Sequence, residues 1–360
     1  MSDPITILET AYVLAGDERQ WLNQLLETAR RDSAGGCEWV VGQTYDATPA
    51  DGVAVRANGH SGMDESTMTA RSAQAALPKG EEHKLAPLFR RPFVGSLRAS
   101  SDALRRAGVD ERRVRKFEMG LDEAFRQWGI ADELWINAQD PTGVGCLVVV
   151  PRRRAGPLPP RDVHRWRYVA SHVATAFRIR RQLEAWSPVP RLNDVSSLEA
   201  ILAPNGALAH ALEPAQTPPA RAALSRAVKA LDRARGSLRR RNPDEAISIW
   251  QAMVAGRWSL LDHIDSDGRR YVLAHRNDAR VPDARGLTLR ERQVVAYAAL
   301  GQSNKVIGYE LGLSTSTVGG HLARARAKLA LPSAAPLRPR GGEGPRATST
   351  IRPRSKKSTS

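Results

Sequence analysis

The segment from Leu287 to Leu331 constrains the fold of this chain more than any other part of the sequence. It holds three short helical patterns, separated by a Gly-Gln-Ser stop at Gly301 and a Gly-Leu-Ser stop at Gly312. Glycine commonly ends a helix because it adopts the left-handed conformation needed there, and serine is a preferred cap for the next helix. This punctuation predicts a helix-turn-helix unit, whose last helix can lie in the major groove of double-stranded DNA.

Each of the three patterns begins with a capping signal and carries one apolar face. Thr288 and Glu291 have the spacing of a capping box, in which the two side chains satisfy each other's backbone amides. Ser303 is expected to cap the second helix, and Ser314 or Ser316 the third. The apolar face of the third helix is formed by Val318, Leu322, Ala325 and Leu329.

These residues resemble the LuxR-type helix-turn-helix family of bacterial transcriptional regulators. The match rests on Leu287-Thr288, Arg290-Glu291, Val294, Gly301, Ser303-Asn304-Lys305, Ile307, Leu311, Ser314, Thr317-Val318, His321-Leu322 and Lys328-Leu329. The resemblance implies that the third helix enters the major groove and that Lys305 and the helix termini approach phosphates. The DNA-contacting residues expected from it are Ser303, Asn304, Lys305, Ser314, Thr315, Ser316, Thr317, Val318, Gly319, Gly320, His321, Arg324, Arg326 and Lys328.

Two positions of the third helix depart from the family pattern. The family often has basic or polar residues where this chain has Gly319 and Ala323, and neither can make the paired hydrogen bonds that distinguish bases. Gly319 and Gly320 also cost a helix roughly 1 kcal/mol each relative to alanine. We therefore expect a partly frayed third helix and modest sequence specificity, with Arg324, Arg326 and the basic tail attracting phosphates.

A third departure follows Leu331, where the family continues into a helix that pairs two DNA-binding units. Pro332, Pro336 and Pro339 interrupt any helix here. The pairing helix is expected to be short or missing. A homodimer would then depend on the long helix at residues 160–186 or on the N-terminal sheet.

Residues 1–186 show a different order of elements. A helical pattern at 7–31 is followed by strands at 38–45 and 52–57, poorly patterned loop and short helix at 58–100, and a helical stretch at 101–127. Strands at 132–138 and 144–150 and the long helix then complete the region. This order resembles the GAF class of sensor domains, which implies an antiparallel sheet with helices on its faces and a small-molecule ligand.

Residues 197–280 contain two hairpin patterns with helices between them, and they resemble a reduced PAS-like domain or an α+β connector. A Pro-rich linker at 187–196 precedes them. The helix-turn-helix domain is assigned to 283–332, and a disordered basic tail to 333–360. The predicted fold class is thus α+β and multidomain, with antiparallel sheets in the N-terminal part and an all-α domain in the C-terminal part.

Charge divides the chain in the same way. Residues 1–220 hold 27 basic and 27 acidic residues, whereas residues 221–241 hold eight basic and one acidic, and the whole chain has a net charge of +16. A neutral N-terminal part and a basic C-terminal part are typical of a sensor domain joined to a nucleic-acid-binding domain. The expected partners are double-stranded DNA, a small ligand in the N-terminal domain, RNA polymerase and a second copy of the chain. No signal peptide or membrane span is indicated, so a cytoplasmic location is expected.

The predicted function is a one-component transcriptional regulator, in which a signal sensed by the N-terminal region alters promoter binding. The alternative is a protein-interaction or nucleoid-associated factor with a degenerate helix-turn-helix. An enzyme is not expected, because no GxSxG, GxxxxGK or HExxH motif occurs. Cys37 and Cys146 are isolated and the histidines share no metal-ligand spacing, so neither a cofactor nor a metal site is predicted.

Overall fold

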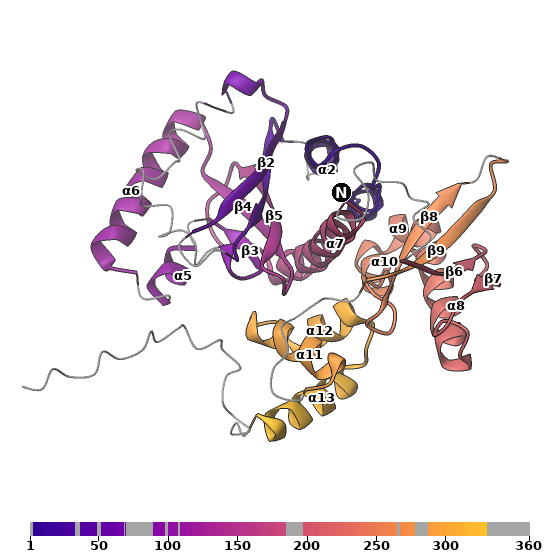
Figure 1. Cartoon of the computed structure of the whole chain (residues 1–360). Coiled ribbons are helices and arrows are strands. Elements are labelled where there is room, and N and C mark those ends of the chain that lie inside the picture. Colours follow the sequence, from indigo (N-terminus) through magenta and orange to yellow (C-terminus); the bar gives the residue numbers. More distant parts are fainter. Residues whose placement is uncertain are drawn as a thin grey trace, which may run out of the picture.

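The computed structural model describes residues 3–32, 37–48, 52–67, 69, 89–97, 100–106, 109–184, 197–264, 267–277 and 287–329. Within these ranges the chain forms two antiparallel sheets with their helices, followed by a C-terminal group of three helices (Figure 1). The α+β fold class is therefore as predicted. No helix in the part of the chain described here is long and apolar enough to cross a membrane.

The N-terminal sheet has five antiparallel strands in the order β2-β1-β5-β4-β3. Both predicted strand pairs are present, and the turn after Gln139 joins β4 to β5 as expected. β3 lies in a stretch predicted as loop and short helix, because four residues are too few for a clear alternation. The strands are β1 (Val40–Asp46), β2 (Ala54–Ser61), β3 (Phe93–Ser96), β4 (Asp132–Gln139) and β5 (Val144–Arg152).

Both faces of this sheet are covered, and β5 shows how its side chains divide between them. Cys146, Val148 and Val150 point into the main core, whereas Leu147 and Val149 point into a smaller cluster on the opposite face. Successive side chains of a strand alternate in this way, so a strand covered on both sides is apolar throughout. The main core lies under α1 (Pro4–Ala11), α2 (Glu18–Asp32) and α7 (Pro160–Glu184); the smaller one lies under α5 (Ser100–Arg106) and α6 (Glu111–Trp128).

The single helical pattern expected at residues 7–31 is two helices. α1 ends at Ala11 and α2 begins at Glu18. Gly16 between them has a φ of +80°, a conformation that breaks a helix and that residues with a Cβ rarely adopt. The sequence shows one continuous apolar pattern because α1 and α2 each bury an apolar side. Trp21 of α2, for example, stacks on Phe177 of α7.

The long helix α7 is the centre of the molecule. Every residue from Tyr168 to Arg180 is buried, including the polar side chains of His172 and Arg178. A helix that is buried all round has no free stripe for a second copy of the chain. Residues 168–180 therefore offer no surface to a second copy of the chain, and pairing through the exposed first two turns of this helix, or through the sheet, stays a prediction.

The second sheet has four antiparallel strands in the order β7-β6-β9-β8, and it matches the two predicted hairpins. Its core is continuous with that of the first sheet, since Leu202, Leu224 and Val272 belong to the same apolar cluster as Phe177. Its elements are β6 (Leu198–Leu202), β7 (Leu208–Ala211), α8 (Pro218–Arg233), η3 (Ala234–Leu238), α9 (Arg239–Arg241), α10 (Pro243–Ile249), β8 (Trp258–Ile264) and β9 (Arg270–Arg276).

The C-terminal helices are α11 (Leu289–Ala299), α12 (Asn304–Leu311) and α13 (Thr315–Lys328), as the stop signals predicted. The capping box is present: the Glu291 amide donates to Thr288 Oγ1 at 3.3 Å, and the Thr288 amide donates to Glu291 Oε2 at 2.9 Å. Gly301 and Gly312 both have positive φ, as helix-ending residues should. Pro332, Pro336 and Pro339 lie outside the described residues, and so does the predicted tail.

The expected fraying of the third helix is not seen, because α13 runs through Gly319 and Gly320 without a break. Ser314 caps it, with its Oγ accepting from the amide of Thr317 at 3.0 Å. Burial of Val318 and Leu322 in the core of the three helices then fixes the segment on both sides of the glycines. Tertiary packing thus outweighs the low helix propensity of the two residues.

Candidate nucleic-acid interface

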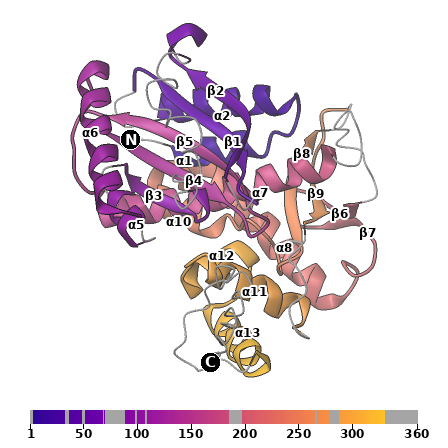
Figure 2. The same cartoon turned by 60° about the vertical axis from the view of Figure 1, so that its left-hand side comes forward.

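The helix α13 lies on the side of the helix-turn-helix away from the N-terminal sheet, with α12 between them (Figures 1 and 2). Its first turn is exposed at Thr315, Ser316 and Thr317, and Ala323 further along is exposed as well. A Cβ added at Gly319 would meet nothing within 4 Å. The structure therefore presents an open surface of hydroxyl groups, backbone and methyl groups along α13.

Two of the three predicted basic residues of α13 form ion pairs with an acidic residue of α11. Lys328 Nζ lies 2.7 Å from Glu291 Oε2, and Arg324 Nε lies 3.6 Å from Glu291 Oε1. Glu291 is only 2% exposed, and its hydrogen bond with Lys328 is the main cause that lowers its pKa to about 2. These cations therefore tie α13 to α11, and Arg324 also contacts Nδ1 of His321 at 3.0 Å.

The remaining predicted residues have distinct surroundings. Val318 is buried and serves packing, whereas Gly320, His321 and Arg326 are half-buried. Ser314 is exposed, but its hydroxyl is already used as the helix cap. Some of the predicted DNA-contacting residues therefore pack or cap the helix, and the others form a smaller exposed surface.

The N-terminus of α12 faces the N-terminal region. Ser303 caps this helix by accepting from the amide of Val306 at 3.4 Å, and Asn304 and Lys305 are exposed. Partial burial, together with the nearby charges of Lys305 and Arg167, lowers the pKa of His164. Lys305 therefore lies near basic groups of α7, and the structure places the predicted phosphate contacts at two separate locations.

The opposite end of α12 docks into the core through Tyr309. Its hydroxyl donates to the backbone oxygen of Ile247 at 2.8 Å and also contacts the Trp250 oxygen and Nε2 of His172. Tyr12 contacts the other ring nitrogen of His172 at 3.0 Å. Burial lowers the pKa of His172 to about 3, so the ring is neutral, and protonation at Nε2 satisfies both tyrosines.

Glu310, the next residue, is a buried carboxyl group at the same junction. It is 3% exposed, and its Oε1 accepts from Ser171 Oγ of α7 at 2.7 Å and from Gln302 Nε2 at 3.4 Å. Burial raises its pKa to about 7. A helix of the predicted DNA-binding unit thus carries a titratable group directly against the N-terminal region.

A second junction is centred on Arg178 of α7. Its guanidinium group donates to Asp140 Oδ2 at 3.0 Å and to Asn277 Oδ1 at 2.9 Å, and it reaches the Tyr297 hydroxyl at 3.5 Å. Asp140 belongs to the turn between β4 and β5, Asn277 follows β9, and Tyr297 lies on α11. One buried cation therefore holds three parts of the chain together.

The loop before β8 also contributes to the helix-turn-helix core. Met253 packs among Val294, Ile307 and Leu322, and the backbone oxygen of Gly256 accepts from Gln293 Nε2 at 3.3 Å. A Cβ at Gly312 would lie 2.2 Å from the backbone oxygen of Met253. Gly312 is thus needed for this close approach as well as for its positive φ of 64°.

Sequence reasoning missed the residues that form these junctions. Tyr309 and Glu310 were not singled out from the sequence, although Glu310 lies one helical turn after the apolar Val306. The available signal was the polar content of the 160–186 helix, since Ser171, His172 and Arg178 interrupt a pattern that otherwise reads as core. Buried polar side chains need partners, but the pattern does not say which ones.

The comparisons agree with the geometry of the C-terminal helices. Residues 285–337 match the family model described as bacterial regulatory proteins, luxR family. A search of curated proteins finds no match for the chain. The family match and the exposed face of α13 point to DNA binding. Residues 285–337 are therefore a LuxR-family helix-turn-helix domain, which identifies a DNA-binding role in transcription regulation.

Proposed function

We propose that the chain is a one-component transcriptional regulator, in which the region before residue 197 senses a signal and alters promoter binding by the helix-turn-helix. The observation that carries the proposal is the LuxR-family domain at residues 285–337 with its third helix exposed. The five-stranded sheet with helices on both faces supports a GAF-like sensor region.

The junctions support coupling between the two parts. Tyr309 and Glu310 belong to the helix-turn-helix, yet they are buried against α7 and α10 of the preceding regions. A signal that moves α7 would therefore change the position or the stability of α12. Coupling of this kind requires a difference in contacts between two states, and the buried Glu310–Ser171 contact is one that an undocked α12 would lose.

The exposed surface favours modest sequence specificity. Thr315, Ser316 and Thr317 can donate and accept hydrogen bonds, but Gly319 and Ala323 offer no polar group to bases. Much of the affinity should come from phosphates, for which Lys305 is the exposed candidate at the start of α12.

Footprinting of the full-length protein on genomic fragments tests the proposal. Discrete protected sites are expected, whereas even coverage at all protein concentrations would favour the nucleoid-associated alternative. Binding to a protected fragment should then be measured across a range of salt concentrations for Lys305→Gln and for Lys116→Gln, an exposed lysine on α6. The first should weaken binding and reduce the salt slope by about 1, and the second should leave both unchanged.

A further inference from the structure

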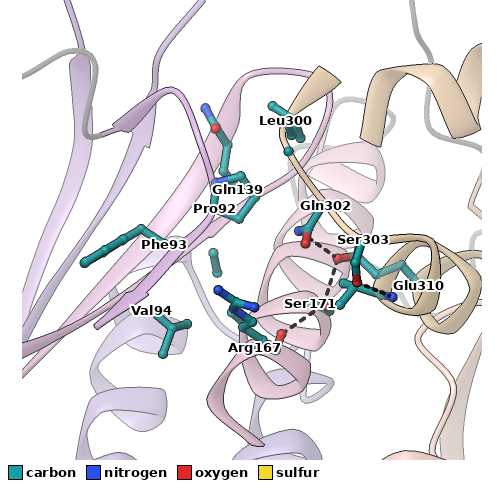
Figure 3. Close-up of a pocket in the computed structure, with 14 residues that line it drawn as sticks. Pro92, Phe93, Val94, Gln139, Arg167, Ser171, Leu300, Gln302, Ser303 and Glu310 are labelled. Atoms are coloured by element: carbon teal, nitrogen blue, oxygen red, sulfur yellow. Dashed lines mark hydrogen bonds between the residues drawn. The ribbon is translucent and has the colours of Figure 1, made fainter. Parts of the chain in front are cut away.

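The start of α12 and the N-terminal part of α7 meet at a small pocket between the helix-turn-helix and the N-terminal region. Arg167 of α7 lines this pocket from one side, and Gln302 and Ser303 of the turn before α12 line it from the other (Figure 3). Asn304 and Lys305 begin α12 directly after these residues. The junction is therefore at the end of α12 where the resemblance to the LuxR family predicts contacts with DNA phosphates.

Arg167 is a cation that the described part of the chain leaves unpaired. The residue is exposed, and its side chain forms no ion pair or hydrogen bond with any residue that the structure describes. Arg161 and Arg165 of the same helix differ from it, because both pair with Asp244. The guanidinium group of Arg167 can therefore pair with an anion outside the chain.

Lys305 brings a second cation to the same place. It is exposed at the start of α12 and forms no ion pair within the described ranges. Partial burial lowers the pKa of His164, and the charges of Lys305 and Arg167 lower it further, so both cations lie near this ring. Asp244, the acid that acts on His164 in the opposite direction, is already held by two arginines. The surface beside the start of α12 is thus positively charged.

Buried contacts fix the position of Arg167 relative to α12. Ser171, one helical turn further along α7, donates to Glu310 of α12 at 2.7 Å. His172, the next residue of α7, contacts the hydroxyl of Tyr309, and both of these side chains are buried. Because these contacts join α7 to α12, Arg167 belongs to the same surface as Lys305.

We propose that Arg167 binds a DNA phosphate next to those that Lys305 contacts, so that the N-terminal region forms part of the DNA-binding surface. This inference rests on the proposed function and adds a contact from outside the helix-turn-helix. Each strand of duplex DNA carries one phosphate for about 3.4 Å of its axis, and cations on two adjoining helices match such a row of charges. Guanidinium groups bind phosphates through paired hydrogen bonds. A signal that moves α7 would then change the DNA contacts directly.

Fluorescence anisotropy with the full-length chain and a labelled duplex tests this contact across a range of salt concentrations. One duplex is a fragment protected in footprinting, and a duplex of shuffled sequence is measured beside it. At about 0.1 M salt, Arg167→Gln should weaken binding roughly fivefold to tenfold and reduce the salt slope by about 1. Both duplexes should show the change, because phosphate contacts do not read sequence. Arg167→Lys keeps the charge and should retain the salt slope.

Arg154→Gln is the matched control. Arg154 is exposed and follows β5 at the end of that strand opposite the Asp140 turn. Its substitution should leave both the affinity and the salt slope unchanged. Circular dichroism melts verify that all three variants fold.

Wild-type affinity and salt slope in Arg167→Gln would overturn the inference and leave the proposed function standing. Tighter binding by this variant would also overturn it, because the junction would then keep DNA away from α12. Equal losses in Arg154→Gln would overturn it as well, since they would reflect net charge alone. Even coverage in the footprint, together with a reduced slope for Arg167→Gln, would refute the proposed function and retain the phosphate contact.

Discussion

Replacing Glu310 by glutamine isolates the cost of burying a carboxyl group between the helix-turn-helix and the N-terminal region. The group is 3% exposed, and burial raises its pKa from 4.5 to about 7. Ser171 and Arg178 of α7, Tyr297 of α11 and Asp140 of the β4–β5 turn act on it from the surrounding elements. Glutamine keeps the shape and the acceptor for Ser171 but cannot ionise.

The sign of the pH effect follows from the raised pKa. Between pH 4.5 and about 7 the folded chain binds more protons at Glu310 than the unfolded chain does. The stability due to this group is fully present below pH 4.5 and is lost as the pH rises through 7. At about 1.4 kcal/mol for each pH unit, the loss by pH 8 is about 3 kcal/mol, and Glu310→Gln does not suffer it.

Thermal unfolding followed by circular dichroism from pH 5 to pH 8.5 measures this difference. The melting temperatures of the two proteins should be similar at pH 5, and Glu310→Gln should melt about 4 °C higher at pH 8. Other titrating groups are common to both proteins and cancel in the comparison. Glu118→Gln is the control, because Glu118 forms an exposed ion pair with Arg105 and such pairs contribute less than about 1 kcal/mol.

A stability difference that does not change with pH would refute the reasoning. So would a wild-type protein that is more stable than Glu310→Gln at pH 8. The first result would mean that the carboxyl group is solvated, and hence that α12 is not docked against α7 in solution. The second would mean that the ionised carboxylate is stabilised in the folded chain by a cation such as Arg178.

Four further substitutions probe the same arrangement. Tyr309→Phe removes the hydroxyl that bonds the backbone before β8, and should lower the free energy of unfolding by about 1–3 kcal/mol in urea titrations. Gly319→Ala fills open space on α13 and should stabilise the chain by about 0.5–1 kcal/mol. Gly312→Ala should destabilise the chain, because Gly312 has a positive φ and an added Cβ would meet a backbone oxygen. Equal changes of the melting temperature in the two variants would contradict the structure. Arg178→Leu leaves the Asp140 carboxylate buried without its cation and should cost about 3–5 kcal/mol, a loss that differential scanning calorimetry would detect.

Local signals in the sequence determined the helix boundaries of the DNA-binding domain. Thr288, Ser303 and Ser314 cap their helices by short-range hydrogen bonds to backbone amides, and Gly301 and Gly312 end them by positive φ. These effects depend on neighbours within about four residues, so the residue pattern is sufficient to predict them. The strand pairs around the Asp140 turn were predictable for the same reason.

Other features could not be obtained from local patterns. The continuity of α13 through Gly319 and Gly320 depends on the burial of Val318 and Leu322. The break at Gly16 could not be predicted, because the apolar pattern of α1 continues in α2. The burial of residues 168–180 of the long helix, polar side chains included, was not evident from its own residue pattern. Each of these outcomes depends on contacts between distant segments, which outweigh propensities of about 1 kcal/mol per residue.

The sequence by itself determined that the chain carries a LuxR-type helix-turn-helix, because caps, stops and apolar spacing are local properties. Only the tertiary structure decided what that unit touches. It brought Glu310 to Ser171, Tyr309 to His172, and Arg178 to Asp140 and Tyr297. Polar side chains do not specify their partners in a sequence, since a buried hydrogen bond depends on two groups that folding brings together.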